Sequence, residues 1–430
     1  MTWGERAERT ILHIDGDGFF AACEQALNPA YFGKPIVTGA ERGIAAAMSY
    51  EAKRRGVTRG MSVSEIKKVC PEVIFVPSDY ETYSLFSRRM FNIFRRYTET
   101  VEEYGIDEGF LDITGMRSSL HLGYPEIAKQ IQQTVQKELG ITVSVGLSAT
   151  KALAKTGSKW NKPNGFTIIP VSTRLEYLSQ LPAVKIWGIG INTAAHLEHF
   201  GVRTAGQFAV QTEEWVTRNF SKPIVELWQE LNGVSVWSVN SEIPVPSVSV
   251  SKTKTFTPSL TDQDNIFAEL MKNIENACIK LRRHGLSGKK FAIFAKHADF
   301  TMRGMEGDLI RASNLPADFV PAAKELFGKL YQTGKWYRAT GFVVSGLTEE
   351  TTFQSSLFEP PNRLEKWKQA YQAVDAMSAK FGKHTIHLAG SEASHQRAPR
   401  FGAVAGRRFA GVSGETKRRH LGLPLLASVK

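Results

Sequence analysis

The chain has 430 residues, of which 42% are hydrophobic and 22% charged, and it carries a net charge of +12 with a pI near 9.5. This composition is typical of a folded soluble protein, and the length exceeds what one ordinary core can use, so we expect several domains. The basic excess favours a polyanionic partner, with nucleic acid ahead of a membrane surface.

The sequence also excludes several classes of protein. No apolar stretch reaches the length of about 18 residues that a transmembrane helix needs, and the mixed charges at the start argue against a signal peptide. Cys23, Cys70 and Cys278 are far apart and form no C-x-x-C pair. We therefore expect buried, reduced thiols in a cytoplasmic protein, with neither a zinc site nor disulfides.

The first part of the chain alternates strands and helices. Apolar runs predict strands at 11–15, 73–76, 110–113, 142–147 and 166–169. Apolar residues at three- and four-residue spacing predict helices over 80–97 and 127–139. Strands interleaved with helices on one face of a mixed sheet predict an α+β layer.

The rest of the chain divides into three parts. Residues 171–240 have the pattern of short helices, and 241–248, with two prolines, predict an extended linker. The next hundred residues predict strand–helix–strand–strand–helix–strand, with strands near 249–256, 290–299, 306–311 and 337–347 and helices near 263–284 and 318–332. Residues 362–381 could form one more helix, and the remainder, rich in Gly, Ala, Ser and Arg, is expected to be disordered.

Carboxylates stand at the ends of two predicted strands, at Asp15 and Asp17 in the first cluster and at Asp107 and Glu108 in the second. Acids gathered in this way offer hard oxygen ligands, which favour Mg²⁺ or Mn²⁺ over zinc. Two such ions roughly 3.5–4 Å apart can clamp the attacking and leaving oxygens of a phosphoryl transfer. The alternative is that Asp15 and Asp107 are merely exposed acids at strand ends or turns. Two clusters, each beside an apolar strand and aromatic residues, favour the metal site.

The two acidic clusters, ILHIDGDGFF at 11–20 and YGIDEGFLDIT at 104–114, resemble the catalytic motifs of the Y-family DNA polymerases, especially the bacterial DNA polymerase IV (DinB) branch. The resemblance continues in the family's order through AMSYEAKRRG, VGLSATKALAK, NKPNG and IWGIG, which begin at residues 47, 145, 161 and 186. It covers about the first 350 residues.

The resemblance implies an α+β right-hand polymerase with a palm, fingers, a helical thumb and a separate α+β little finger. The expected divisions are 1–22 and 78–170 for the palm, 23–77 for the fingers, 171–240 for the thumb with a helix-hairpin-helix element, 241–248 for the linker, 249–352 for the little finger, and 353–430 for a tail with a clamp-binding peptide and a basic end.

The activity implied is template-directed, error-prone translesion DNA synthesis without proofreading. Two Mg²⁺ ions, for which Mn²⁺ can substitute, would serve the transfer of dNTPs to a primer 3′-hydroxyl. The enzyme would be a monomer that acts on primer–template DNA and docks on a sliding clamp, with no membrane partner.

Two alternatives remain at this stage. One is a catalytically inactive Y-family accessory protein that only binds DNA and partners, and the intact acids argue against it. The other is a different two-metal enzyme on a similar palm, such as a nucleotide cyclase or nuclease. The little-finger and helix-hairpin-helix regions argue against this second alternative.

By resemblance, Asp15, Asp107, Glu108 and the backbone carbonyl of Gly16 would ligate the metals, and Glu108 would lie beside the primer 3′ oxygen. Asp17 is expected to lie next to the metal ligands without binding the metal itself. These assignments make Asp15, Asp107 and Glu108 the candidate catalytic residues.

The candidate nucleotide contacts are Phe20, Tyr50, Lys53 and Lys162. Phe20 would be a steric gate that excludes a 2′-hydroxyl, although Phe19 and Phe20 could both be core residues. Tyr50 and Lys53 lie three positions apart, on one face of a predicted helix, and could reach one phosphate group. Lys53 could equally belong to a plain charged helix end, and the family commonly has Arg there.

The candidate DNA contacts lie in two regions. Gly188 and Gly190 would let backbone N–H groups approach a phosphate, although without the surrounding match a tight helix–helix turn would be the better explanation. Lys252 and Lys254 would lie on one face of a strand, opposite Ser251, Thr253 and Thr255, with further charge from Arg282, Arg283, Lys289 and Lys290. Gln354, Leu357 and Phe358 resemble the clamp-binding peptide of bacterial polymerases.

Overall fold

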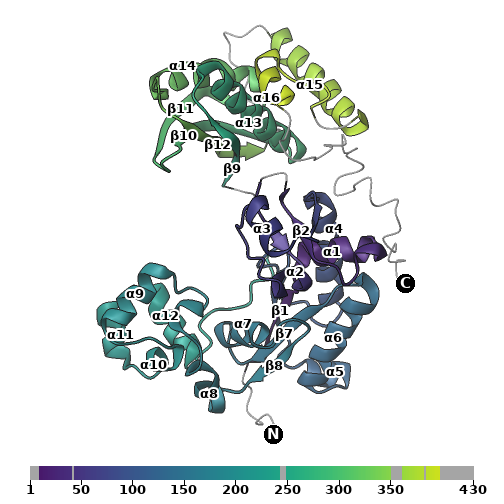
Figure 1. Cartoon of the computed structure of the whole chain (residues 1–430), viewed down its shortest axis with the longest axis vertical. Coiled ribbons are helices and arrows are strands. Elements are labelled where there is room, and N and C mark those ends of the chain that lie inside the picture. Colours follow the sequence, from purple (N-terminus) through teal and green to yellow (C-terminus); the bar gives the residue numbers. More distant parts are fainter. Residues whose placement is uncertain (1–8, 41–42, 243–247, 350–360, 382–383, 398–430) are drawn as a thin grey trace. The chain divides into compact units, whose positions relative to one another are not determined.

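The computed structural model describes residues 9–40, 43–242, 248–349, 361–381 and 384–397 (Figure 1). They form two compact units, one of residues up to 242 and one of residues from 248 onward. Among the helices that the structure describes, none is both long and apolar enough to cross a membrane. Cys23, Cys70 and Cys278 are buried free thiols, as predicted.

The centre of the first unit is a five-stranded sheet in the order β5-β6-β1-β7-β8. Its strands are β1 Ile11–Gly16, β5 Val101–Glu102, β6 Glu108–Asp112, β7 Val143–Ser148 and β8 Phe166–Ile169. Strand β1 pairs antiparallel with both β6 and β7, and every residue of β1 is buried. The acids at the end of β1 therefore lie in the middle of the sheet.

Helices cover both faces of this sheet (Figure 1). Helices α4 Tyr80–Phe94 and α6 Tyr124–Leu139 pack their apolar residues against Leu12 and Ile14 of β1. Helix α7 Lys151–Trp160 covers the other face, where His13 bonds to a serine of α7. Side chains alternate along a strand, so Asp15 also points to the α7 side. Gly146 permits close packing of α7, since a Cβ there would lie 1.9 Å from a carbonyl oxygen of that helix.

A smaller sheet follows helix α1 Phe19–Leu27 in the chain. It has the order β3-β2-β4, with β2 Ile36–Thr38, β3 Ala47–Met48 and β4 Ile74–Val76, and it is accompanied by α2 Tyr50–Arg54 and α3 Val63–Val69. Helix α5 Met116–Leu120 lies before α6. The predicted strand at 73–76 belongs to this sheet and not to the five-stranded one.

Short helices fill residues 174–231, as predicted: α8 Arg174–Leu178, α9 Ile191–His199, α10 Ala205–Ala209, α11 Glu213–Asn219 and α12 Lys222–Leu231. The buried Glu230 ties α12 to α7, because its carboxylate accepts hydrogen bonds from the backbone N–H groups of Ala152, Val236 and Trp237. Three backbone donors on one carboxylate stabilise it without an ion pair.

The second unit has the predicted order of elements: β9 Ser249–Leu260, α13 Gln263–Arg283, β10 Leu286–His297, β11 Met302–Ser313, α14 Pro316–Leu330 and β12 Tyr337–Glu349. The four strands form an antiparallel sheet in the order β11-β10-β12-β9. Its core combines apolar residues of both helices with one alternating set from the strands, so the helices cover a single face.

Helix α15 Pro361–Phe381 confirms the predicted helix at 362–381. The prediction of disorder is wrong for residues 384–397, which contain a 3₁₀ turn and the helix α16 Glu392–Gln396. This segment packs on α13, where Ser394 and Arg397 bond to Glu269. Its order comes from polar contacts with a distant helix, which composition does not reveal. Gln354, Leu357 and Phe358 lie outside the described residues.

Candidate active site

The register of the central strands brings the predicted metal-site residues together. Asp15 on β1 is the cross-strand partner of Glu108 on β6, and Asp107 precedes β6 directly. The backbone N–H of Gly16 donates to the Asp107 carbonyl at 2.8 Å. Residues more than ninety positions apart therefore meet at one end of the sheet.

A left-handed turn follows these acids and starts helix α1. Gly18 has a φ of +57°, and a Cβ at this position would lie 3.0 Å from the carbonyl oxygen of Met48. Glycine is the residue that adopts this conformation without strain. The turn carries the chain directly from the metal-site strand to Phe19 and Phe20.

Two lysines neutralise part of the acidic cluster. Lys162 Nζ hydrogen-bonds to Asp15 Oδ1, and Lys155 Nζ lies 2.6 Å from Glu108 Oε2. The buried Asp17 accepts hydrogen bonds from Ser144 Oγ at 2.8 Å and from the Asn164 N–H at 2.7 Å. Asp17 therefore fixes the loop that carries Lys162.

The two acids of the second cluster differ in their ionisation. Burial, followed by the charges of Asp15 and Glu108, raises the pKa of Asp107. Burial also acts to raise the pKa of Glu108, but the neighbouring His13 ring and the Lys155 ammonium group outweigh it and bring that pKa to about 2. His13 Nε2 lies 3.3 Å from Glu108 Oε2, and burial lowers the pKa of His13 to about 4.

This arrangement fits divalent cations. Asp15, Asp17, Asp107 and Glu108 supply four carboxylates, and two lysines, Lys155 and Lys162, form ion pairs with them among the described residues, which leaves two negative charges. Burial first, and then the charges of Asp15 and Glu108, raise the pKa of Asp107. Clustered carboxylate oxygens around uncompensated charge are the ligands that Mg²⁺ and Mn²⁺ prefer.

Lys155 and His13 contact Glu108, and the sequence reasoning did not single them out. Lys155 is 3% exposed, and its ammonium group lies 4.4 Å from the ring centroid of Tyr104 and 5.2 Å from that of Trp187. The available signal was the four-residue spacing of Lys151, Lys155 and Lys159, which places three lysines along one stripe of a helix. Lys151 pairs with Glu102 at 2.6 Å, one turn away.

The two adjacent phenylalanines have different environments. Phe19 is buried in the core, whereas Phe20 is only half-buried. The Phe20 ring stacks on Tyr83 with centroids 4.4 Å apart and meets the edge of Tyr80 at 5.4 Å. Tyr83 in turn donates to Glu24 at 2.7 Å. These contacts fix the orientation of the Phe20 ring.

Tyr50 and Lys53 lie near the acids and near each other. Lys53 Nζ is 5.2 Å from the Tyr50 ring centroid. Burial, with the charges of Asp17 and Asp15, raises the pKa of the Tyr50 phenol. The predicted nucleotide contacts Tyr50 and Lys162 therefore share one acidic neighbourhood, and Lys53 borders it.

The glycine hairpin has the geometry expected for a close backbone approach. Gly188 has a φ of +93°, and Gly190 is the residue before α9, with open space where its Cβ would be. Between α8 and α9 the side chain of Trp187 donates to Tyr104 Oη at 3.0 Å. The hairpin is thereby attached to the sheet beside Lys155.

Lys252 and Lys254 occupy the helix-covered side of the edge strand β9. They pair with Phe342 and Thr340 of β12, both fully buried, whereas Ser251, Thr253 and Thr255 face the open side. Burial, with the charges of Lys280 and Arg283, lowers the pKa of Lys252.

Arg282, which we predicted to add positive charge near Lys252 and Lys254, is paired with a carboxylate instead. Arg282 forms two bonds of 2.7 and 2.8 Å with the carboxylate of Asp375 on α15, and it donates to the Asn314 carbonyl at 2.9 Å. These three contacts commit its guanidinium to internal structure, so Arg282 adds no charge for DNA.

Comparison with known proteins agrees with this architecture. A profile of the impB/mucB/samB family matches residues 14–159, and a profile of the C-terminal domain of the same family matches residues 247–357. A solved structure of a Y-family DNA polymerase chimera matches 79% of the chain and 99% of its own length, with a TM-score of 0.68 and 24% identity.

Several curated proteins named DNA polymerase IV are similar over most of the chain. The protein of Lactococcus lactis subsp. cremoris is 35% identical over 350 residues, which cover 79% of this chain and 94% of the relative. The protein of Desulfatibacillum aliphaticivorans is 30% identical over 385 residues, which cover 89% and 96%. The chain thus has the fold of a DNA-directed DNA polymerase and belongs to that class of enzyme. It belongs to the Y family of DNA polymerases and is similar to bacterial proteins named DNA polymerase IV.

Proposed function

We propose that the protein performs error-prone translesion DNA synthesis without proofreading, using two Mg²⁺ ions to add dNTPs to a primer 3′-hydroxyl. The observation that carries this proposal is the cross-strand pairing of Asp15 with Glu108, with Asp107 bonded through its backbone to Gly16. A small fingers sheet of three short strands supports tolerance of damaged template, because it would enclose the nascent pair loosely.

Asp15, Asp107, Glu108 and the Gly16 carbonyl would hold the metal ions. Bound divalent cations would lower the pKa of the primer hydroxyl and neutralise charge on the transferred phosphoryl group. Glu108 stays ionised because Lys155 and His13 hold its pKa near 2. Its carboxylate is therefore available beside the primer oxygen at any physiological pH.

The nucleotide would be held by residues near this cluster. Phe20, oriented by its stack on Tyr83, would exclude a 2′-hydroxyl from the sugar site. Lys162, Tyr50 and Lys53 would bind the triphosphate, the lysines as point charges and the tyrosine through its hydroxyl. The matched test is a comparison of dNTP and rNTP incorporation.

The DNA would be held through its phosphates. The backbone N–H groups after Gly190, at the start of α9, and the side chains of Lys252 and Lys254 are the proposed contacts. Both kinds of contact ignore sequence, which suits a polymerase that acts as a monomer on any primer–template.

Residues 354–358, QSSLF, are the proposed clamp-binding peptide. Leu357 and Phe358 would insert into a clamp pocket as apolar anchors. A synthetic peptide spanning 350–362 should bind the clamp in a titration, and the same peptide with both anchors changed to Ala should not. Failure of the native peptide to bind would refute this part of the proposal.

Primer extension with purified protein, Mg²⁺ and four dNTPs tests the activity itself. Asp107→Ala should abolish extension while primer–template binding stays near the wild-type level. A catalytically inactive accessory protein would bind DNA and extend no primer in the wild-type form, and that result would overturn the proposal.

A further inference from the structure

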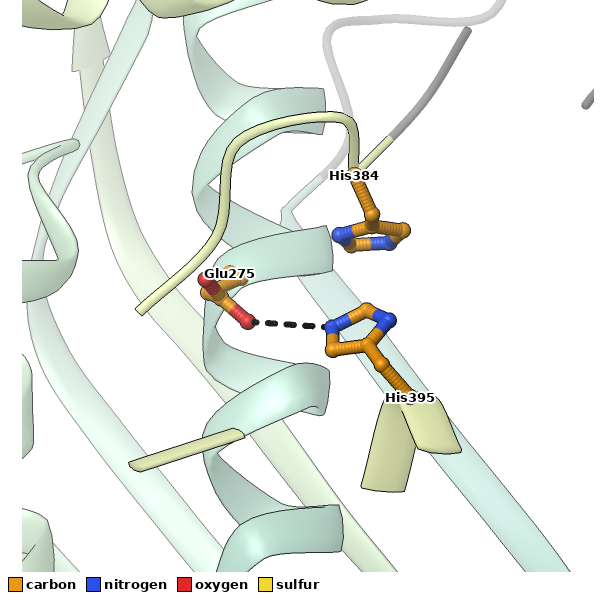
Figure 2. A group of neighbouring side chains, drawn as sticks. All are labelled: Glu275, His384 and His395. Carbon is orange, nitrogen blue, oxygen red and sulfur yellow. Dashed lines mark ion pairs between the residues drawn. The ribbon is translucent and has the colours of Figure 1, made fainter. Parts of the chain in front are cut away.

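A second cluster of possible ligands lies in the unit formed by residues from 248 onward (Figure 2). Glu275 comes from α13, His384 from the segment after α15, and His395 from α16. One ligand atom from each residue lies within 4.8 Å of the other two. Both histidines lie beyond residue 357, where the family match ends.

Two polar atoms in this cluster are buried and have no hydrogen-bond partner among the described residues. Glu275 is 6% exposed, and its Oε1 accepts from the Leu388 N–H at 2.7 Å. Its Oε2 is unpartnered and lies 3.9 Å from the unpartnered Nε2 of His395. This separation exceeds a hydrogen bond, so a third group is needed to satisfy both atoms.

The third ligand, His384, is oriented by a hydrogen bond to Asn276. The Asn276 amide is oriented by its Nδ2, which donates to the Lys272 carbonyl at 2.8 Å, so Oδ1 is the atom that faces His384 Nε2 at 3.1 Å. An acceptor at Oδ1 places the proton of His384 on Nε2 and leaves the lone pair on Nδ1. A hydrogen-bond acceptor on the far ring nitrogen is the usual support of a metal-binding histidine.

We propose that Glu275, His384 and His395 bind a divalent cation of the zinc class, which fastens residues 384–397 to α13. Two imidazoles and a carboxylate suit Zn²⁺, whereas Mg²⁺ prefers an all-oxygen set. A cavity of about 190 Å³, lined by Glu275, His384 and His387 among others, gives the ion a path to the site. Bonds of about 2.0–2.1 Å need the three side chains to move closer, which rotation about their χ angles allows. The fourth position of a tetrahedral ion would be taken by water.

The test is a zinc titration of the full-length protein after removal of metals, against a chromophoric competitor. Excess Mg²⁺ occupies the acidic cluster around Asp15 and Asp107, so that zinc bound there does not add to the measured stoichiometry. We expect about one Zn²⁺ per chain, and a loss of affinity of at least about 100-fold in both Glu275→Gln and His395→Gln. His284→Ala, which removes an exposed histidine next to the same helix, is the matched control and should bind as the wild type does.

A second measurement separates a metal site from a merely structural cluster. Zn²⁺ should slow amide hydrogen exchange in residues 384–397 of the wild type but not of Glu275→Gln, whose amide oxygen can still accept from Leu388. Three results would each overturn the proposal. They are binding of clearly less than one Zn²⁺ per chain, equal zinc affinity in Glu275→Gln and His284→Ala, and a hydrogen-exchange rate of residues 384–397 that zinc does not change. Primer extension takes no part in this test, so its outcome is independent of the polymerase activity.

Discussion

Asp107 is half-buried beside two other acids, and its raised pKa has a consequence for stability. The folded state holds the proton of Asp107 more tightly than the unfolded state does. In the metal-free protein, stability is therefore lost as the pH rises from 3.8 through the folded pKa. Above that range the ionised Asp107 lowers the free energy of unfolding by a constant amount, which a bound cation would offset.

Asp107→Asn should therefore separate stability from activity. Without metal, the variant should unfold at a higher temperature than the wild type at neutral pH, because the unfavourable charge is gone. Its primer extension should fall by several orders of magnitude, and Mg²⁺ should stabilise it less than it stabilises the wild type. Thermal unfolding with and without Mg²⁺ checks both effects. A variant that is less stable than the wild type without metal would contradict this account of Asp107.

Phe20→Ala should admit ribonucleotides, because the ring that would occupy the space beside C2′ is gone. The measurement is the ratio of dNTP to rNTP incorporation efficiency, which should fall by at least about 10-fold for a steric exclusion worth about 1.4 kcal/mol. Phe19→Leu is the control, since Phe19 is buried in the core. It should lower the thermal midpoint and leave the ratio unchanged. An unchanged ratio in Phe20→Ala would assign that ring to packing.

At the scale of single elements, helix α7 carries two lysine–glutamate pairs one turn apart. Lys155 holds Glu108, and Lys151 holds Glu102. The pKa of Glu108 is about 2 in the folded protein against 4.5 ordinarily. This depressed pKa contributes stability that is present above pH 4.5 and lost as the pH falls toward about 2.

Lys155→Met should remove much of this acid-sensitive contribution. The variant should be less stable at neutral pH and should lose less additional stability between pH 4.5 and about 2 than the wild type does. Its primer extension should also fall, since Glu108 loses the partner that positions it. Lys151→Met is the matched control, which should lose stability but keep the same acid profile for Glu108. Identical acid profiles in Lys155→Met and wild type would contradict the role given to Lys155.

The individual elements also show which features of the site could be predicted from the sequence. Asp15 and Glu108 were predictable because an apolar strand that ends in acids has a recognisable pattern. The burial of Lys155 was not, because a lysine on a helix is normally solvated, and the aromatic rings beside this one, Tyr104, Phe110 and Trp187, come from distant segments. Alternation predicted that Lys252 and Ser251 face opposite sides, but only the sheet order tells which side the helices cover.

At the scale of the molecule, the basic excess should make primer–template binding steeply salt-dependent and nearly indifferent to sequence. With six phosphate contacts, the slope of log affinity against log salt would be about −5. Lys252→Ala and Lys254→Ala should each reduce this slope by about 1. Lys324→Ala, an exposed lysine on α14, is the control and should leave it unchanged. Equal slopes in all three variants and wild type would show that β9 does not touch the backbone.

Across the whole chain, secondary structure could be predicted where it follows from local sequence patterns. It could not be predicted where it depends on contacts with residues far away in the sequence. The strand–helix–strand–strand–helix–strand order of the second unit follows from local periodicity. The ordered segment at 384–397 does not, since Glu269 and Glu275 of α13 bind the Ser394 hydroxyl and the Leu388 backbone N–H. Arg282 was misassigned for the same reason, because its partner Asp375 lies ninety-three residues away.

Lys162, bonded to Asp15 and carried by a loop that Asp17 fixes, gives the idle enzyme an internal counter-ion. The aspartate charge is thus covered between turnovers. In its proposed role at the triphosphate, the same ammonium group would leave Asp15 when nucleotide phosphates attract it. Nucleotide entry would then uncover the carboxylate at the moment that it is needed. In the resting enzyme Asp15 would then be paired with Lys162, and it would become available to a metal ion only when the nucleotide arrives.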